Sequence, residues 1–395
     1  MPRPLSILCL LRDPLPPRRA DVLTLFGVEL PRHGIHTALL GQAAGTADNT
    51  WPGGALYLAG RFGGAANSVL APLRDTWALL RTALATRPDC IQVRDKILVA
   101  VLALLAAALL RIPFVYWMSF PIVEGYAVHA RDGAVRCAAL HRLRASMTRC
   151  LLYRLVLPQA ALVFVQSAAM ADALAARGIA RARLAAVPMG VDLALVAHVT
   201  PAPDTRLDGR RVVVYLGSVA RSRASLFLLE LAAALATTRP DVLLVIAGDA
   251  PSPAEAAWFR AALAQRANVV FTGWLAHVDA LGYVARADVG IAPIPRGALF
   301  DVSSPTKLVE YLALGVPAVA SDIPDQQLVL DASGAGLCVP MTVAAFCGAI
   351  TALLDDPDRA ARGARGQAWV RAHRSYDVLG RQVAQRYRSL LEKTS

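Results

Sequence analysis

The stretch that decides the fold of this chain is SSPTKLVEYLALGVPAVASDIP, residues 303–324. Small and polar residues open it, and the cation Lys307 and the acid Glu310 follow in a pattern that predicts the start of a helix. Gly315 predicts the end of that helix, and the apolar run 316–320 is typical of a short buried strand. A polar loop, a helix and a buried strand in this order indicate an α/β domain.

The same stretch has the chemistry of a nucleotide-sugar site. The first N–H groups of a helix have no intrahelical partner and the helix dipole favours negative charge, so the loop before Lys307 predicts an anion site. Glu310, one turn further on, can accept hydrogen bonds from the hydroxyl groups of a sugar or a ribose. The alternative is an ordinary loop and helix with Glu310 in solvent. The loop residues of the predicted anion site are Ser303, Ser304, Pro305 and Thr306.

Residues 304–322 resemble the retaining glycosyltransferases of family 4, whose members carry SP-x-K-L-x-E-Y-x-A-x-G-x-P-V-V-A-S-D at this place. The resemblance implies the α/β GT-B fold, in which two Rossmann-like doubly wound parallel-sheet domains face a central cleft. It also implies an enzyme that transfers a sugar with retention of configuration. Neither a metal nor another cofactor is expected, and the nucleotide sugar is the substrate.

Both halves of the chain show the pattern of such domains. Short, near-continuous apolar runs alternate with helical stretches, which predicts parallel sheets covered on both faces. Helical patterns are clearest at residues 21–32 and in the wholly apolar run 97–110. The predicted strands are residues 6–11, 34–40, 91–93, 113–118 and 161–166 in the first half and 211–216, 242–247, 269–272, 289–293 and 316–320 in the second.

We predict four parts along the chain. Residues 1–192 form the acceptor-binding domain, and residues 193–209, which contain prolines and lack periodicity, form a linker. Residues 210–374 form the nucleotide-sugar-binding domain. By resemblance, the final helix at 375–395 crosses back to the first domain.

Further donor-binding residues are expected at strand ends of the second domain. Gly217 and Gly248 each follow a predicted strand, and glycine lets a ligand approach the backbone closely. The family carries an arginine where Ser218 stands, and Arg221 and Arg223 supply the cations slightly later, in a form suited to phosphate oxygens. The alternative for Arg221 and Arg223 is a solvated surface pair.

The resemblance assigns other positions around the base and the sugar. Leu275 and His277 correspond to the positions that hold the base, although His277 is equally compatible with an ordinary surface loop. Pro293 begins a loop that borders the donor sugar. The second glutamate of the family corresponds to Val302, and Asp301 stands one residue too early.

The first domain departs from the family. Ser119 stands where a histidine usually contacts the reacting sugar, and Glu124 is the nearest alternative polar group. Arg94 and Asp95 end a predicted strand, where they either face the cleft or form a local ion pair. The Gly-Gly loop of the family is replaced by residues 16–19, PPRR. The predicted catalytic set is Glu310, Lys307, Arg223, Ser119 and Glu124.

Metal and disulfide frameworks are not indicated. Residues 356–358 spell D-x-D, a metal-binding pattern of another glycosyltransferase fold, but they lie in a run typical of a helix cap.

The six cysteines form no C-x-x-C pair, which favours reduced thiols in the cytosol. The longest apolar stretch, 97–110, is too short to span a bilayer and predicts a core helix.

Positive charge is concentrated in the first half. Residues 1–192 contain 21 Lys and Arg against 11 Asp and Glu, and the whole chain carries a net charge of +12. The mean hydropathy is +0.45. Around residues 136–154, apolar positions recur at helical spacing opposite arginines, which favours peripheral contact with the cytoplasmic face of a membrane over a core-facing stripe. No nucleic-acid motif accompanies the charge. The basic residues are Arg136, Arg142, Arg144, Arg149 and Arg154.

These observations lead to one functional hypothesis and two rivals. The hypothesis is transfer of a sugar from a UDP- or GDP-sugar to a lipid-linked saccharide or a polysaccharide acceptor in polysaccharide biosynthesis. One rival is a GT-B epimerase, which releases an altered nucleotide sugar. The other is a catalytically silent nucleotide-sugar-binding partner.

Overall fold

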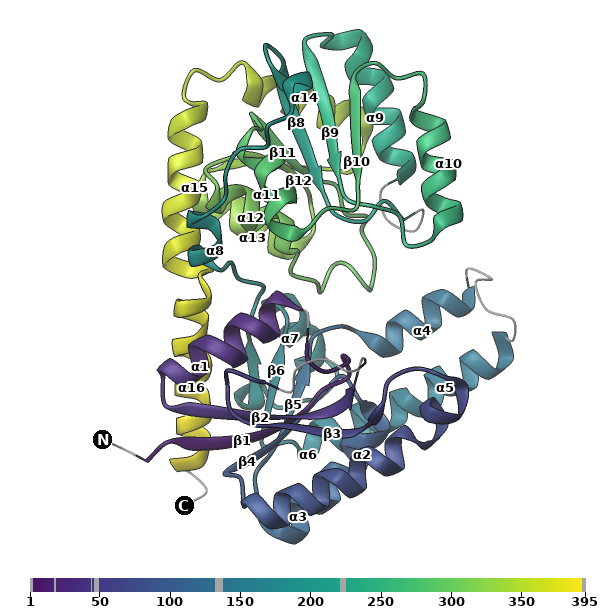
Figure 1. The fold of residues 1–395 in the computed structure, drawn as a ribbon, viewed down its shortest axis with the longest axis vertical. Coiled ribbons are helices and arrows are strands. Elements are labelled where there is room, and N and C mark those ends of the chain that lie inside the picture. Colours follow the sequence, from purple (N-terminus) through teal and green to yellow (C-terminus); the bar gives the residue numbers. More distant parts are fainter. Residues whose placement is uncertain are drawn as a thin grey trace. The chain divides into compact units, whose positions relative to one another are not determined.

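The computed structural model describes residues 3–17, 19–43, 45, 50–131, 138–220 and 225–392 (Figure 1). Its contacts divide the chain into two compact units. Unit 1 consists of Met1–Pro188 and Tyr376–Ser395, and unit 2 of Met189–Ser375. The predicted domain limits remain a prediction, but residues 193–209, expected to be a linker, lie within unit 2.

Unit 1 is built on a seven-stranded parallel sheet with the order β3-β2-β1-β4-β5-β6-β7. The central strand β1 pairs with β2 in the register Leu5↔Ile35 and with β4 in the register Ile7↔Cys90. Strands β4, β5 and β6 are buried along their whole length, as expected for apolar runs without alternation. The strands are β1 (Leu5–Leu10), β2 (Ile35–Ala43), β3 (Leu56–Arg61), β4 (Cys90–Arg94), β5 (Phe114–Met118), β6 (Leu162–Val165) and β7 (Leu184–Ala186).

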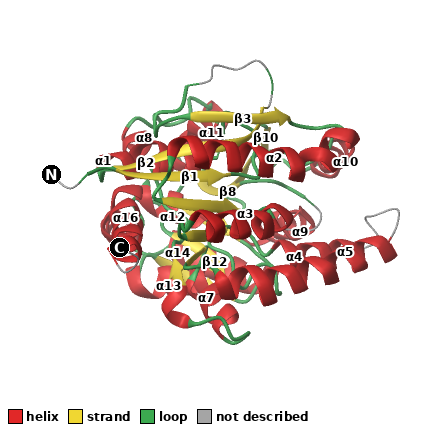
Figure 2. Cartoon of the chain, turned by 90° about the horizontal axis from the view of Figure 1, so that it is seen from below, coloured by secondary structure: helices red, strands yellow, loops and turns green. Residues whose placement is uncertain are grey.

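Helices cover both faces of this sheet. Helices η1 and α16 pack on a core that includes Phe26, Trp117 and Tyr387, whereas α2, α3 and η2 pack in succession over the other face, as right-handed crossovers require. Figures 1 and 2 show α2 and α3 side by side. The helices are η1 (Asp21–Glu29), α1 (Leu30–Arg32), α2 (Ala65–Thr86), α3 (Ile97–Leu110), α4 (Ile122–Arg131), α5 (Ala138–Cys150), η2 (Leu151–Val156), α6 (Leu157–Gln159), α7 (Ala168–Ala175), η3 (Arg181–Arg183) and α16 (Tyr376–Glu392).

Unit 2 repeats the architecture with a six-stranded parallel sheet, in the order β10-β9-β8-β11-β12-β13. The strands are β8 (Arg211–Leu216), β9 (Val242–Ala247), β10 (Val269–Gly273), β11 (Val289–Ala292), β12 (Ala318–Ser321) and β13 (Gly336–Val339). The helices are α8 (Leu193–Ala197), η4 (Thr205–Leu207), α9 (Ser225–Thr238), α10 (Pro253–Leu263), α11 (His277–Ala285), α12 (Thr306–Ala313), α13 (Pro324–Ser333), α14 (Val343–Leu354) and α15 (Arg359–His373).

The prediction of two parallel-sheet α/β domains is confirmed. Strands β8 and β9 have the predicted bounds, and Gly315, with a φ of +76°, follows α12 as expected. The elements that were not predicted include β3, α2 and β13. Glycines at 53, 54, 63 and 64 and a proline at 72 interrupt the first two patterns, and β13 is only half buried.

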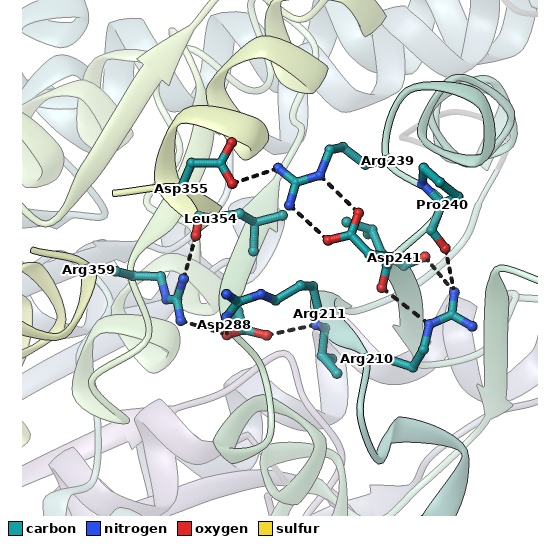
Figure 3. A network of polar contacts seen from close by, with 11 residues as sticks. Arg210, Arg211, Arg239, Pro240, Asp241, Asp288, Leu354, Asp355 and Arg359 are labelled. Atoms are coloured by element: carbon teal, nitrogen blue, oxygen red, sulfur yellow. Dashed lines mark hydrogen bonds and ion pairs between the residues drawn. The ribbon is translucent and has the colours of Figure 1, made fainter. Parts of the chain in front are cut away.

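A network of ion pairs ties the amino ends of the strands in unit 2 together (Figure 3). Asp288, just before β11, accepts the Val212 backbone N–H at 2.8 Å and lies 2.9 Å from Nη2 of Arg359. Arg239 contacts both Asp241 and Asp355, at 2.9 and 3.0 Å. These side chains stabilise the sheet edge opposite to the carboxyl ends of the strands, where ligands bind in doubly wound folds.

Candidate functional site

The carboxyl ends of β8 and β9 form a close backbone junction in unit 2. Gly217 and Gly248 follow these strands with φ values of +131° and +147°, which side chains rarely adopt. A Cβ on Gly248 would lie 2.2 Å from the Gly217 carbonyl oxygen, and the Gly217 N–H donates to Ala247 O at 2.9 Å. Neither glycine carries a side chain at this junction, and the adjacent Ser218 carbonyl accepts a hydrogen bond from the Tyr215 hydroxyl at 2.9 Å.

Lys307 brings a cation to the same edge. Its Nζ lies 4.0 Å from the centre of the Tyr215 ring and 3.4 Å from the point where a Cβ on Gly217 would stand. Lys307 is the second residue of α12, whose N-cap, Pro305, makes no side-chain capping bond to the helix. The uncapped helix start with Thr306 and Lys307 thus presents positive partial charge and a full charge near the glycine junction.

Glu310 and His277 come together although 33 residues separate them. The Glu310 carboxylate is 8% exposed, and its Oε1 lies 2.8 Å from Nε2 of His277. The hydrogen bond to Glu310 raises the pKa of His277, against the opposite effect of partial burial. His277 is the first residue of α11 and its side chain is 45% exposed, so the pair can meet a ligand from solvent. The alternative of a solvated Glu310 is wrong.

Tyr311 anchors α12 to the sheet, and the sequence reasoning missed it. Its buried hydroxyl accepts the Leu216 N–H at 2.8 Å and donates to Ile291 O at 3.1 Å, so it joins β8 to β11. The ring packs on Gly290, where a Cβ would come within 2.4 Å of it. Because Tyr311 follows Glu310 directly, this anchor also fixes the position of the Glu310 carboxylate relative to the sheet. The adjacent residues Glu310 and Tyr311 were the sequence signal from which this anchoring role could have been inferred.

The loop before α12 uses its hydroxyl groups for folding. Ser304 is buried, accepts the Met189 N–H at 3.0 Å and donates to Asp325 at 2.7 Å. Asp325 in turn pairs with the buried Arg374 at 2.7 Å. Ser303 donates to the Phe300 carbonyl at 2.7 Å. An anion at this loop would therefore meet mainly backbone N–H groups and the amine of Lys307, not the serine hydroxyls.

The other predicted donor residues differ in their exposure and contacts. Pro293 is buried after β11, and Asp301 accepts hydrogen bonds from Arg296 at 2.8 Å and the Gly297 N–H at 3.2 Å. Leu275 is half-buried beside a hollow of about 630 Å³ between α11 and residues 200–206. Arg221 and Arg223 lie outside the described residues.

In unit 1, Ser119 is paired with Asp95. The Ser119 N–H donates to one oxygen of Asp95 at 3.0 Å and its hydroxyl donates to the other. Asp95 has a φ of +56°, uncommon for a residue other than glycine, and burial raises its pKa. Arg94 pairs with Asp21, and its Nε also lies 3.9 Å from Asp95, so the local Arg94–Asp95 ion pair is present. It belongs to a wider cluster at the ends of β4 and β5.

Glu124, the other candidate in unit 1, is held by its neighbours. Its carboxylate accepts hydrogen bonds from the Tyr153 hydroxyl at 2.9 Å and from Nη1 of Arg177 at 2.8 Å. The Arg177 guanidinium stacks 4.4 Å from the centre of the Tyr153 ring. Glu124 therefore lies in a local ion-pair network between α4, η2 and the segment after α7.

The basic helix expected near residues 136–154 corresponds to α5 and η2. Leu143 and Met147 are 57% and 55% exposed, so these two residues do not fit the alternative of a core-facing stripe. Arg144 donates to the Tyr126 hydroxyl at 3.2 Å, and Arg136 lies outside the described residues. No helix in the described part of the chain is long and apolar enough to cross a bilayer. The remaining exposed arginines of this region are Arg142, Arg149 and Arg154.

Two acidic clusters have residue types that can bind a metal. Asp356 of the D-x-D sequence accepts the Asp358 N–H at 2.8 Å and pairs with Arg362, so its carboxylate is held by residues at and within the start of α15. In unit 1, carboxylate and imidazole atoms of three residues lie within 4.8 Å of one another, but two of the three also form ion pairs with arginines. These three residues are Glu29, His33 and Asp377.

Two family models match the chain. The model described as "Glycosyl transferases group 1" matches residues 210–356, and the model described as "Glycosyl transferase 4-like domain" matches residues 20–190. The alpha-D-kanosaminyltransferase of Streptomyces kanamyceticus is 27% identical over 186 residues, which is 47% of this chain and 47% of that protein. The match thus spans about half the length of this curated relative.

Solved structures share the fold over nearly the whole chain. Sucrose-phosphate synthase from Thermosynechococcus elongatus superposes with a TM-score of 0.72 at 20% identity, covering 98% of this chain and 100% of that chain. Anabaena HepE in complex with UDP-glucose gives a TM-score of 0.67 at 19% identity, with the same coverage of 98% and 100%. At these identities the likeness concerns the fold, and the predicted GT-B fold is confirmed.

Proposed function

The chain belongs to the glycosyl transferases of group 1, and we propose that it transfers a sugar from a UDP- or GDP-sugar to a saccharide acceptor. One observation carries the proposal. The buried carboxylate of Glu310 and the amine of Lys307 lie on the first turns of one helix, whose uncapped start meets the glycine junction of β8 and β9. A carboxylate for sugar hydroxyls and a cation with helix-end amides for a diphosphate fit the two halves of a nucleotide sugar.

In this proposal unit 2 binds the donor. Lys307 and the first N–H groups of α12 hold the diphosphate, with Arg221 and Arg223 as additional cations expected from the sequence. Glu310 accepts hydrogen bonds from the ribose hydroxyls, and His277 orients the carboxylate. Because Gly217 has no side chain and the Lys307 amine lies beside it, the phosphates can approach the backbone and this cation together.

The proposed step breaks the bond between the anomeric carbon and the diphosphate oxygen, which keeps the electron pair. An acceptor hydroxyl forms the new bond on the same face of the sugar, so that configuration is retained, and its proton passes to the departing diphosphate. The protein lowers the barrier by stabilising the charge that develops on the leaving group. We assign this role to Lys307, the arginines and the helix start, without a metal.

For the acceptor we propose a lipid-linked saccharide or a growing polysaccharide at the cytoplasmic face of a membrane. Support comes from the charge of residues 1–192 and from the outward apolar side chains of α5 among its arginines. Ser119 and the Asp95 that it contacts are the proposed polar groups of unit 1 toward the sugar. The names of the relatives, a kanosaminyltransferase and a UDP-glucose complex, support sugar transfer and favour UDP as the nucleotide.

A label-transfer experiment tests the proposal against its rivals. Purified protein is incubated with labelled UDP- and GDP-hexoses and a membrane lipid extract, with Glu310→Ala as the control. We expect label in the lipid or polysaccharide fraction, dependent on Glu310. An isomerised free nucleotide sugar would instead identify an epimerase, and donor binding without turnover would identify a silent partner. Absence of any nucleotide-sugar binding would refute the proposal altogether.

A further inference from the structure

Two neighbouring helices of unit 1 expose several large apolar side chains. Isolated exposed leucines are ordinary on a protein surface, but a gathered group of them marks an interaction site. Six such residues on these helices have exposed fractions from 51% to 81%. We refer to them as the α2–α3 face: Leu73, Trp77 and Leu84 on α2, and Leu98, Leu105 and Leu109 on α3.

The spacing of the six side chains puts them on the outer side of both helices. Members on one helix are separated by four, seven or eleven residues, which places them on one side of an α-helix. The opposite sides are buried, with Leu79 and Ala83 of α2 and Ala103 of α3 fully inaccessible. Helices α2 and α3 pack against each other over the same sheet (Figures 1 and 2). Because the six side chains are exposed while the opposite sides of both helices are buried, we place the two apolar stripes next to each other on the solvent side.

The exposed charges that the structure describes on α2, on α3 and at their C-caps are all positive. Helix α3 contains no charged residue, and the one acid of α2, Asp75, is 1% exposed and pairs with Lys96 at 2.6 Å. The Arg81 guanidinium lies 5.5 Å from the centre of the Trp77 ring, at the edge of the apolar stripe. The exposed cations are Arg74 and Arg81 on α2 and the C-cap residues Arg87 and Arg111 of the two helices.

We propose that the α2–α3 face docks on the surface of a bilayer that contains anionic lipids. The two helices lie along the membrane plane, with the leucines and Trp77 among the upper acyl chains and the arginines at the lipid phosphates. A tryptophan at the edge of such a patch is suited to the membrane–water interface. The inference goes beyond sugar transfer and beyond the arginines of α5, because it rests on different helices.

The charge pattern favours a lipid surface over a second copy of the chain. In a twofold dimer the same patch meets itself, so the four arginines of one copy would face those of the other. Such like-charge contact is unfavourable, whereas anionic lipid headgroups neutralise the same cations. Helix α3 is consistent with this location, because it is apolar but too short to span the bilayer and can lie at the bilayer surface.

Vesicle flotation tests the proposal without any donor or acceptor. The full chain is mixed with phosphatidylcholine vesicles, with or without phosphatidylglycerol, and compared with the variant Leu73→Gln/Trp77→Gln/Leu105→Gln/Leu109→Gln. We expect the wild type to float with the anionic vesicles and the variant to lose at least about tenfold in partitioning. The control Leu226→Gln/Leu328→Gln removes leucines of unit 2 that are 56% and 48% exposed, and it should float like the wild type.

Three results would overturn the proposal. They are a wild type that does not float, a fourfold variant that floats equally well, and a wild type that is dimeric by light scattering while the variant is monomeric. The last result would assign the face to a second copy. Thermal melting checks that the fourfold variant is folded. If the fourfold variant does not fold, the double variant Leu105→Gln/Leu109→Gln takes its place in the flotation experiment. Flotation involves no sugar transfer. A negative flotation result therefore leaves the proposed transferase activity standing, and a negative transferase result leaves the membrane proposal standing.

Discussion

The Glu310 carboxylate gives the sharpest test of the donor site. Glu310→Gln keeps the shape of the side chain but removes its charge, so the hydrogen bonds it accepts become neutral ones. Hydrogen bonds to charged groups contribute about 1.5–3 kcal/mol and neutral ones about 0.5–1.5 kcal/mol. The side chain is 8% exposed, so solvent screens the difference little. We therefore expect nucleotide affinity to fall by about 1–3 kcal/mol, which is about 5- to 150-fold in Kd.

Isothermal titration with UDP and, separately, GDP measures this loss directly. Neither ligand carries the donor sugar, so the result reports on the ribose and phosphate contacts alone. Asp279→Asn is the matched control, because Asp279 is an exposed carboxylate on α11, two residues from His277, and it should bind like the wild type. A Glu310→Gln protein with an unchanged melting temperature and a Kd within about twofold of the wild type would refute the assignment of Glu310 to the ribose.

Two further predictions concern the same helix. Tyr311→Phe leaves the Leu216 N–H and the Ile291 carbonyl without their hydrogen-bond partner. We therefore expect the free energy of unfolding, measured by urea titration, to fall by about 2–4 kcal/mol. A loss below about 0.5 kcal/mol would contradict the anchoring role. The raised pKa of His277 means that its bond to Glu310 stabilises the fold fully below about pH 6.5, and that this contribution is lost as the pH rises through the folded pKa. Since His277 is half-exposed, His277→Gln should cost about 0.5–1 kcal/mol below about pH 6 and less above about pH 8; an equal loss in melting temperature at both pH values would exclude the ionic pair.

Local patterns were sufficient for much of the donor domain. The apolar runs of β8 and β9 end where a glycine follows, so both bounds were predicted correctly. The helix start before Lys307 and the glycine after α12 are signals carried by neighbouring residues, and the structure has both. Elements without such signals were missed. Strand β3 and helix α2 lie among glycines and a proline, which mask the periodicity on which the prediction depends.

The pairing of distant residues depended on the tertiary structure. His277 was assigned to the base and Glu310 to the ribose as separate groups, and only the order of strands β8, β11 and β12 with helices α11 and α12 brings them within 2.8 Å. The role of Ser304 was hidden for the same reason, since its partners Met189 and Asp325 are remote in sequence. Asp21, which joins Arg94 and Asp95 in one cluster although it is remote in sequence, is a third case.

Helix α3 shows most clearly what the sequence determined and what it did not. Fourteen consecutive apolar residues determine that a helix forms here and that it cannot span a bilayer. They do not determine which side is buried, because a helix that is apolar on all sides has no pattern to orient it. Packing against the sheet, α2 and η2 decides that Leu105 and Leu109 remain at the surface. The sequence therefore specified the elements and the donor motif, whereas tertiary packing decided which groups meet and which surfaces are left for partners.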